Sequence, residues 1–528
     1  MTKTANKILR LLCILLCVLQ CLPGCRAGRA AGKAANDKYR TTYEIFVGSF
    51  CDSDQDGTGD LNGIRSKLDY IEDLGFDAIW LTPVHPSSTY HKYDVDDYYA
   101  VDPAFGTMDD FEDLLEDCHK RGISVYMDLV LNHTSEDHEW FRAASDYLHE
   151  LPEGWEPDAS YCRYYDYYNF SREPADGFAW FEGTDWYYEA GFWSEMPDLN
   201  LSSEAVREEI RGIMSYWLGK GVDGFRLDAV MSYYEGDTAA NEEFLSFLTG
   251  TARGIDPDCY LVGEAWTDRD TISALYGSGI DSLFEFPYAG RDGIIANTLN
   301  GLCPPSYYVS SMVQTETANA KSDPDFIEAP FYTNHDMDRS AEYYPDDSGA
   351  VTKMAYAMNL LMPGNAFVFY GEELGMCGAG KDENRRAPMY WSDDAADPDM
   401  CAGPPGMDEV WMKYPSLADQ KGDDSSIYNW FKEVIRVRNE YPAIACGVTG
   451  EASFLCDDKT AAFFRKGGAG DDLLIVMNLS PQAVEKDLSK QIKGFRLAES
   501  LETSGESITY KGRILRMPAY SIAVFTAK

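Results

Sequence analysis

The chain has 528 residues, 45% of them apolar and 25% charged, with 88 acidic residues against 45 basic ones and a formal net charge of −43. This length and composition predict a folded protein with a large core and more than one domain, and they exclude an intrinsically disordered chain. Because the acidic residues are spread over the whole length, the surface is expected to repel nucleic acid and anionic lipid.

Residues 1–25 have the features of an export signal. Basic residues precede the apolar run LLCILLCVLQCL, which is well short of the roughly 20 residues that span a bilayer. The run ends in Leu22-Pro23-Gly24-Cys25, which resembles a bacterial lipobox. We therefore expect an extracellular or cell-surface lipoprotein, attached to the membrane only through lipid on Cys25. Simple secretion and an uncleaved membrane anchor are the alternatives.

From residue 36 the chain alternates short β-rich runs with amphipathic segments. Segments with helical spacing, such as LNGIRSKLDYIEDLG and MDDFEDLLEDCHKRG, follow most of the runs. The runs are YEIFV, AIWL, SVYMDLV, GFRLD, YLVGE, SLFEF, PFYTNHD and AFVFYGEE. Eight strand–helix units predict an α/β fold, a (β/α)8 TIM barrel over residues 36–133 and 201–430.

Two regions break this rhythm. Residues 134–200, after the third run, are rich in Tyr, Trp, Asp and Gly and too long for a crossover, so they are predicted to form an inserted domain. After residue 430 short strands such as DLLIVMNLS and AYSIAVFTA follow one another. This pattern predicts a C-terminal antiparallel β-sandwich over residues 431–528.

Acidic residues stand at the ends of three predicted barrel strands. Asp228 ends the fourth strand, Glu264 ends the fifth and Asp336 follows the seventh. In this type of barrel the carboxyl ends of the strands form the active site. Three carboxylates on that rim suggest acid–base chemistry on a bond between sugars, with a carboxylate nucleophile and a protonated partner.

Four motifs in this order make the chain recognisable. MDLVLNH (127–133), GFRLDAV (224–230), GEAW (263–266) and FYTNHD (331–336) resemble the strand-end motifs of glycoside hydrolase family 13, the α-amylase family. The resemblance covers the chain from about residue 40 to its end. It implies that Asp228 is the nucleophile, Glu264 the general acid/base and Asp336 the stabiliser of the transition state.

Further residues fit substrate binding. Arg226 lies two positions before Asp228 on the same strand face, where its guanidinium can keep that carboxylate ionised. The resemblance implies that His133 and His335 bind hydroxyls of the sugar at the cleavage point and that Tyr93 stacks beneath it. It also implies that Asn132 ties the barrel to the inserted domain.

The substrate is predicted from the same resemblance. Ala229 is typical of members that cut α-1,4 bonds, and MPDLN (196–200) resembles an intermediate subgroup of exported bacterial enzymes acting on starch and maltooligosaccharides. Asp94 and Arg386 resemble a pair that closes the nonreducing end of the pocket in exo-acting relatives. An exo-acting α-glucosidase or oligo-1,6-glucosidase therefore remains an alternative.

Other functions also stay open. A transglycosylase or an isomerising member such as a trehalose synthase would use the same covalent intermediate. Two non-catalytic alternatives are a starch-binding surface protein and the amylase-like heavy chain of an amino-acid transporter. The intact acidic trio and the short apolar run oppose the transporter heavy chain. The sequence leaves the oligomeric state open.

The stretch CDSDQDGTGDLNGI, residues 51–64, has acids at alternate positions like an EF-hand loop. A predicted strand precedes it and Gly63 stands at its twelfth ligand position, so it is not an EF-hand. It resembles the DxxGDGxGDLxGI segment of family members, which implies a structural Ca²⁺. The implied ligands are Asp52, Asp54, Asp56, Asp60 and the carbonyl of Thr58. No Lys-His follows Asp228, where MSY stands at 231–233, so a second calcium site is not expected.

Overall fold

The computed structural model describes residues 38–152, 154–345, 347–394, 396–468, 470–489, 492 and 494–527. The predicted export signal, with Cys25, lies outside the described residues. Within those ranges, none of the helices combines the length and the apolarity that crossing a bilayer requires.

A seven-stranded parallel sheet forms the centre of the protein. Its strands follow the order β10-β1-β2-β3-β7-β8-β9. They are buried on both faces, because one face lines the barrel interior and helices cover the other. The strands are β1 (Thr41–Ile45), β2 (Ala78–Leu81), β3 (Ser124–Leu129), β7 (Gly224–Leu227), β8 (Tyr260–Gly263), β9 (Ser282–Leu283) and β10 (Ala366–Phe369). Strands that are adjacent in this sheet order pair in parallel, as the predicted TIM barrel requires.

The seventh predicted strand, at 330–336, does not form. Residues 328–330 take its place between β9 and β10. The N–H of Glu285 donates to the carbonyl of Ala329 at 3.1 Å, and the N–H of Phe367 donates to the carbonyl of Pro330 at 2.8 Å. Pro330 has no N–H to donate, so the ladder stays short. The segment nevertheless lies between β9 and β10 and closes the barrel.

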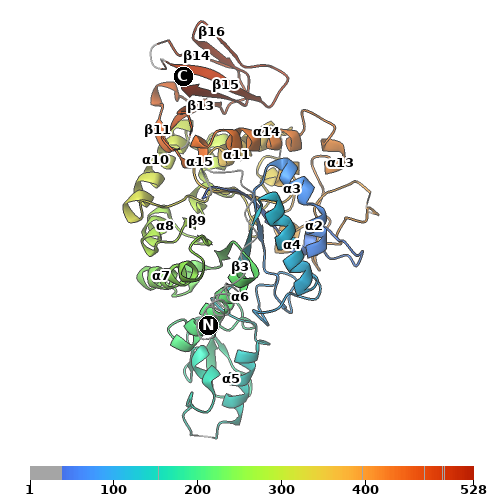
Figure 1. Cartoon of the computed structure of the whole chain (residues 1–528), viewed down its shortest axis with the longest axis vertical. Coiled ribbons are helices and arrows are strands. Elements are labelled where there is room, and N and C mark those ends of the chain that lie inside the picture. Colours follow the sequence, from blue (N-terminus) through green and yellow to red (C-terminus); the bar gives the residue numbers. More distant parts are fainter. Residues whose placement is uncertain are drawn as a thin grey trace, which may run out of the picture. The chain divides into compact units, whose positions relative to one another are not determined.

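Helices surround the sheet (Figure 1). They are α2 (Leu61–Ser66), α3 (Leu68–Leu74), α4 (Met108–Arg121), α6 (Glu204–Lys220), α7 (Thr238–Ile255), α8 (Arg269–Leu275), α9 (Ile294–Leu299), α10 (Pro305–Ser322), α11 (Ala350–Leu360), α12 (Asp382–Arg385), α13 (Leu417–Gln420), α14 (Ile427–Glu440) and α15 (Ala443–Cys446). Local sequence explains their ends. In α4, Thr107 and Asp110 form a capping box, and Gly122 ends the helix in the left-handed conformation.

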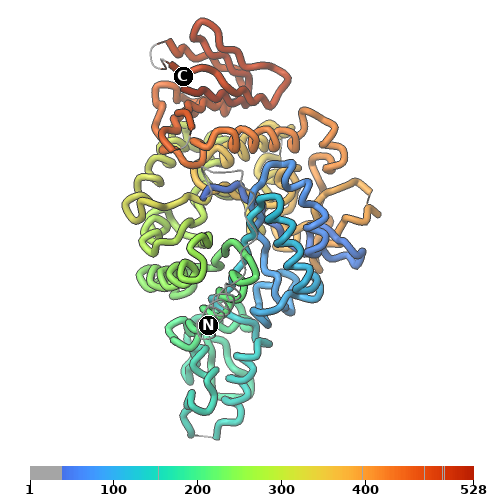
Figure 2. Tube along the Cα trace, viewed as in Figure 1, coloured from blue at the N-terminus to red at the C-terminus, as the bar shows by residue number. Residues whose placement is uncertain are grey.

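Residues between β3 and α6 form the inserted region, coloured teal in Figure 2. It contains α5 (Glu139–Glu150) and a small antiparallel sheet in the order β4-β6-β5. Its strands are β4 (Phe170–Ser171), β5 (Phe178–Trp180) and β6 (Tyr187–Glu189). The amide of Asn132 donates to Asp198 at 2.9 Å, so Asn132 links the end of the third barrel strand to the inserted region.

Two antiparallel sheets follow at the C-terminal end, in the orders β11-β12-β13-β18-β15 and β14-β17-β16. Their strands are β11 (Val448–Glu451), β12 (Thr460–Lys466), β13 (Leu473–Asn478), β14 (Val484–Asp487), β15 (Phe495–Glu502), β16 (Thr509–Lys511), β17 (Ile514–Met517) and β18 (Ser521–Ala527). The first of these strands begins at Val448, later than the boundary expected at residue 430. Helix α14 runs across that boundary because its apolar face packs against α11.

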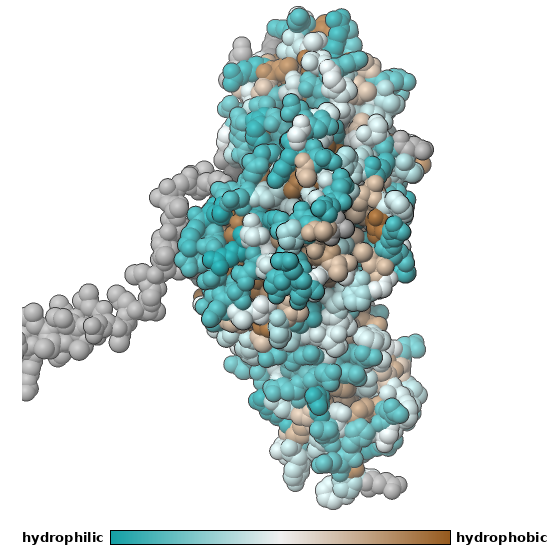
Figure 3. All heavy atoms as spheres, turned by 90° about the vertical axis from the view of Figure 1, so that its right-hand side faces the viewer, coloured by the Kyte–Doolittle hydropathy of each residue, from teal (hydrophilic) through white to brown (hydrophobic). Residues whose placement is uncertain are grey.

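Hydrophilic side chains cover most of the face drawn in Figure 3, and hydrophobic ones form small separate groups on it. This agrees with the acidic composition of the chain. The structure therefore offers a charged, solvated exterior around a buried apolar core.

Candidate active site

Two of the three predicted carboxylates follow adjacent barrel strands. Asp228 comes directly after β7 and Glu264 directly after β8, and these strands pair in parallel. Their carboxyl ends therefore lie at the same rim. Asp336 follows the segment that closes the barrel, and its side chain is more exposed than the other two, at 32%.

Arg226 connects the carboxylates of this rim. Its guanidinium is fully buried and lies 2.5 Å from Asp228, 2.8 Å from Glu264 and 2.8 Å from Asp128. A buried arginine needs such anionic partners, since an uncompensated charge would be costly there. The predicted contact between Arg226 and Asp228 is present, and the arginine also reaches Glu264 and Asp128.

Ala229 follows Asp228 in an uncommon conformation. Its φ of 48° lies in the left-handed region, which residues other than glycine seldom adopt. In this conformation its N–H donates to the Glu264 carboxylate at 3.0 Å. The strained backbone therefore contributes to fixing Glu264 beside Asp228.

His335 and Asp336 form a charged pair. The His335 ring lies 2.7 Å from Glu44 through Nδ1 and 3.1 Å from Asp336 through Nε2. Burial lowers the pKa of His335, but the two carboxylates overcome this effect and raise it to about 10. Burial also disfavours the charged form of Asp336, yet His335 and Arg386 hold the pKa of that carboxyl well below its usual range.

Burial shifts the pKa of Asp228 and of Glu264 in the same direction. It raises the pKa of Asp228 to about 6 although Arg226 opposes the shift. Burial likewise raises the pKa of Glu264, and the nearby charge of Asp228 adds to this effect. The rim thus holds an ionised Asp336 beside Asp228 and Glu264, two carboxyl groups whose pKa values burial raises. A raised pKa suits Glu264 to the part of a proton donor.

Asp94 and Arg386, which resemble the pair that closes the pocket in exo-acting relatives, form no ion pair with each other among the described residues. Asp94 instead accepts hydrogen bonds from the hydroxyls of Ser87, Ser88 and Thr89, with the Ser88 bond at 2.8 Å. Arg386 lies 2.7 Å from Asp336. Hydroxyls of its own loop therefore satisfy Asp94, and Arg386 pairs with Asp336 instead.

The predicted sugar-binding residues lie around the same rim. The Tyr93 ring stacks on His335, with centroids 5.4 Å apart and planes at 9°, and its hydroxyl donates to Asp128 at 2.9 Å. His133 is buried, and its Nε2 lies 3.2 Å from the carbonyl of Tyr93. Tyr93 therefore contacts both histidines directly.

Sequence analysis missed several residues of this rim. Glu44 contacts His335, the Tyr90 hydroxyl accepts from Arg386 at 2.9 Å, and the Trp80 indole N–H donates to Asp128 at 3.3 Å. Phe192, from the inserted region, packs 5.5 Å from His133. An acidic residue inside the apolar run YEIFV was the available signal for Glu44, because a charge in a buried strand needs a partner.

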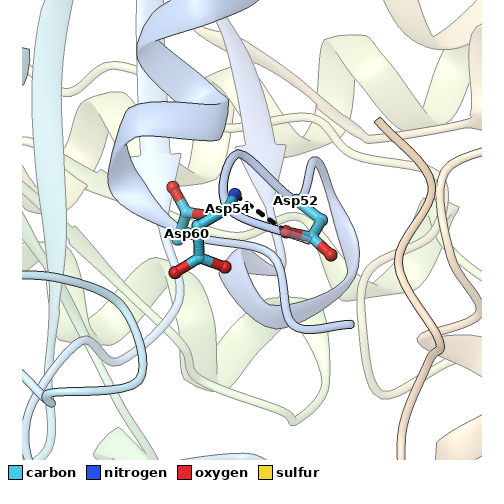
Figure 4. A group of neighbouring side chains, drawn as sticks. All are labelled: Asp52, Asp54 and Asp60. Carbon is cyan, nitrogen blue, oxygen red and sulfur yellow. Dashed lines mark hydrogen bonds between the residues drawn. The ribbon is translucent and has the colours of Figure 1, made fainter. Parts of the chain in front are cut away.

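The acidic loop before α2 gathers three carboxylates, shown in Figure 4. Oxygens of Asp52, Asp54 and Asp60 lie within 4.8 Å of one another. No ion pair to a basic residue is found for them in the described ranges. Asp56 lies outside this group, and its carboxylate accepts the N–H of Thr58 at 2.7 Å. The predicted carbonyl ligand of Thr58 stays a prediction.

The backbone of this loop approaches β1 and its continuation closely. A Cβ on Gly59 would lie 2.2 Å from the carbonyl of Val47, and one on Gly63 would lie 2.0 Å from the carbonyl of Cys51. Only glycine fits at either position. The tight packing fixes Asp60, which caps α2 by accepting from Gly63 at 2.7 Å.

Comparison with known proteins gives consistent matches. A family model described as "Alpha amylase, catalytic domain" matches residues 44–447. Alpha-amylase 3 of Dictyoglomus thermophilum is 36% identical over 455 aligned residues, covering 83% of this chain and 84% of that protein. Trehalose synthase/amylase TreS of Mycobacterium tuberculosis is 31% identical over 522 aligned residues, covering 86% and 84%. The solved structure of Eubacterium rectale Amy13B has a TM-score of 0.91 at 46% identity, covering 93% of this chain and 96% of that one.

Proposed function

This chain belongs to the α-amylase family, glycoside hydrolase family 13, and we propose that it cleaves α-1,4-glucosidic bonds in starch and maltooligosaccharides with retention of configuration. The observation that carries the proposal is the buried Arg226, which lies within ion-pair distance of both Asp228 and Glu264. It holds a nucleophile and an acid/base side by side on the active rim of a TIM barrel.

The mechanism is a double displacement. Asp228 attacks the anomeric carbon from the face opposite the leaving group, while Glu264 gives its proton to the departing glucosidic oxygen. An ester between Asp228 and the sugar results. Glu264, now ionised, takes a proton from water, whose oxygen attacks the anomeric carbon and releases Asp228. Two inversions give net retention.

The surrounding residues act by orientation and charge. Arg226 favours the ionised form of Asp228, and the N–H of Ala229 holds Glu264 in place. Asp336 stays ionised beside His335 and can accept hydrogen bonds from ring hydroxyls that strengthen in the transition state. Tyr93 offers its ring to the apolar face of the same sugar.

Products from defined glucans test the substrate class. We expect soluble starch and amylose to yield maltooligosaccharides, because Arg386 contacts Asp336 and Asp94 contacts its own loop, so the two do not close the nonreducing end. We expect isomaltose to remain uncut, because Ala229 is typical of members that cut α-1,4 bonds. Chromatography of the products against time provides the measurement. Release of glucose alone from chain ends would favour the exo-acting alternative. Conversion of maltose to trehalose would favour the isomerase alternative, toward which the similarity to the trehalose synthase/amylase points.

We further propose that the acidic loop binds a structural Ca²⁺ through Asp52, Asp54 and Asp60. The three carboxylates fit a hard cation, since they gather in a rigid loop with no basic partner among the described residues. Loop carbonyls, including that of Thr58, and water would complete the oxygen shell. The ion would offset the mutual repulsion of the carboxylates and fix the loop that precedes α2.

Removal of calcium is expected to lower the melting temperature by several degrees, because an ion bound only to the folded state stabilises it by mass action. Calorimetry in the presence of EDTA, followed by Ca²⁺ addition, measures the effect. Asp54→Asn should reduce the response to calcium, and Asp176→Asn, at an exposed position of the inserted region, should retain it. A melting temperature independent of EDTA would disprove the site.

The cellular location follows from the sequence as a proposal. The basic and apolar residues before position 25 support export, and the lipobox-like segment supports lipid attachment at Cys25. An enzyme outside the cell would meet polymeric starch directly, which fits the proposed substrate.

A further inference from the structure

Asp336 ends a segment that has no strand ladder, and a side chain from another strand holds this segment in place. Residues 331–336 form no strand. The carboxylate of Glu44, in β1, accepts the backbone N–H of His335 at 3.2 Å and lies 2.7 Å from Nδ1 of the same residue. A buried N–H outside a ladder needs such an acceptor. Glu44 therefore takes the place of a missing ladder bond next to Asp336.

Glu44 points into the barrel and has one close cation there. Neighbouring residues of a strand face opposite sides, and Tyr43 points outward, where its hydroxyl donates to Glu373 at 2.6 Å. Glu44 is 1% exposed, and within the described ranges His335 is its only ion-pair partner. Because a buried carboxylate without a cation is costly, the position favours a positive charge on His335.

Both nitrogens of the His335 ring face hydrogen-bond acceptors. Nδ1 faces Glu44, whereas Nε2 lies 3.1 Å from the Asp336 carboxylate and 2.7 Å from the Tyr93 hydroxyl. That hydroxyl donates its own proton to Asp128 at 2.9 Å, so it accepts from His335. A histidine between acceptors carries a proton on each nitrogen, which makes it an imidazolium. The raised pKa of His335 agrees with this assignment.

We propose that Glu44 is a positioning residue for Asp336, because it orients the His335 ring and keeps that ring protonated, so that Nε2–H holds the Asp336 carboxylate ionised and in place. The proposal rests on the proposed function and adds to it a buried residue that acts through His335. Arg386 completes the arrangement, since its Nε donates to the carbonyl of His335 at 3.1 Å and its Nη2 lies 2.7 Å from Asp336. Side chains from two distant segments thus do the work of a strand ladder.

The groups around His335 determine the sign of the expected change. Removal of the Glu44 charge takes away one of the anions that favour the imidazolium, so the pKa of His335 should fall by roughly 1–3 units. Above this lower pKa, Nε2 would present a lone pair to the Asp336 carboxylate, and their hydrogen bond would be lost. The ring of Trp80, from β2, is a neutral neighbour. The titratable and charged groups that face His335 are Glu44, Tyr93, Asp128, Asp336 and Arg386.

Selective ¹⁵N labelling of histidine measures the protonation of His335 without any reference to activity. The chain has seven histidines, and the signal missing from His335→Gln identifies His335. In the wild type we expect both ring nitrogens to stay protonated through pH 9, because the pKa is raised to about 10. In Glu44→Gln the amide oxygen still accepts from Nδ1 but carries no charge. The titration midpoint should therefore fall by roughly 1–3 pH units.

Glu328→Gln is the matched control. Glu328 is also a buried glutamate, 3% exposed, and the charged groups near it are Glu285, Glu316 and Arg465, away from the rim. Its replacement removes a buried carboxylate of the same kind and should leave the midpoint of His335 unchanged.

α-Maltosyl fluoride, which carries fluoride on the anomeric carbon of maltose, links this proton to activity. Fluoride leaves without protonation, so kcat/KM on this substrate does not depend on Glu264 as an acid. Glu44→Gln should match the wild type at pH 6, where His335 is still protonated. At pH 9 it should fall to about a tenth of the wild type, since a midpoint near pH 8 leaves about a tenth of the imidazolium. Melting temperatures at both pH values verify that each variant is folded.

The outcomes separate this proposal from the proposed function. The same His335 midpoint in the wild type and in Glu44→Gln would overturn the proposal. So would a lowered midpoint without a loss of activity at pH 9, or an equal loss at both pH values, which a purely structural role would give. A wild-type protein that cleaves neither the fluoride nor maltopentaose would overturn the proposed function, while the ¹⁵N titration would still decide whether Glu44 keeps His335 protonated.

Discussion

Asp228→Gly is expected to lower kcat on maltopentaose on the order of 10⁵-fold, the scale of loss when a covalent nucleophile is removed. Without its carboxylate no glycosyl-enzyme can form. Among the described residues, no other group is placed opposite the leaving group to activate water for direct attack. Asp228 is 7% exposed beside a fully buried Arg226, so a small residue leaves a cavity that an anion can enter.

Azide can replace the missing nucleophile. In Asp228→Gly, azide bound beside Arg226 should displace fluoride from α-maltosyl fluoride and give β-maltosyl azide, the inverted product. NMR of the product identifies the anomer. Asp258→Gly is the matched control, because Asp258 is exposed in the turn before β8, at the opposite end of that strand, and should keep full activity. Activity retained in Asp228→Gly, or no azide product, would exclude Asp228 as nucleophile.

The barrel could be predicted from the sequence because its strands are short apolar runs and its helices have amphipathic spacing, and both patterns are local. AIWL forms β2 over the predicted residues, and the other clear runs form strands within a few residues of prediction. The seventh predicted strand does not form, since Pro330 lacks the backbone N–H that a longer hydrogen-bond ladder needs. Helix α14 crosses the expected boundary because packing, which no local pattern reveals, joins it to α11.

The catalytic rim was only partly predictable. Residues within strand-end motifs could be assigned, since parallel strands bring their carboxyl ends together. Partners from distant segments could not, and the contact of Glu44 with His335 spans 291 residues of sequence. The sequence left open whether Asp94 and Arg386 meet, and in the structure hydroxyls of its own loop contact Asp94. Long-range contacts depend on tertiary structure, whereas motifs reveal only which groups are present.

The acidic loop illustrates the same limit. Alternating acids predicted a cation site, and three of the carboxylates do converge. Asp56 does not, and its carboxylate accepts the N–H of Thr58. Asp54 accepts a backbone N–H two residues on in the same way and still belongs to the group, so loop geometry decides which carboxylates converge, and the sequence alone does not provide it.

The activity that Glu264→Ala loses should depend on the leaving group of the substrate. We expect kcat/KM on maltopentaose to fall about 10³-fold, within the range for losing a general acid, because the glucosidic oxygen leaves poorly without a proton. Formation of the glycosyl-enzyme from α-maltosyl fluoride should proceed, since fluoride leaves without protonation. The intermediate on Asp228 should then accumulate, as no base activates water, and mass spectrometry of the intact protein should detect the added maltosyl group.

Azide again gives the decisive product, with opposite stereochemistry. It needs no base, so it should attack the accumulated ester of Glu264→Ala and give α-maltosyl azide, whereas Asp228→Gly gives the β anomer. Glu409→Ala, at an exposed position, is the matched control and should behave as wild type. Equal losses on both substrates, or a β product from Glu264→Ala, would contradict its role. The two variants together distinguish the roles of the two carboxylates, because loss of the nucleophile gives the β azide by one displacement and loss of the acid/base gives the α azide by two.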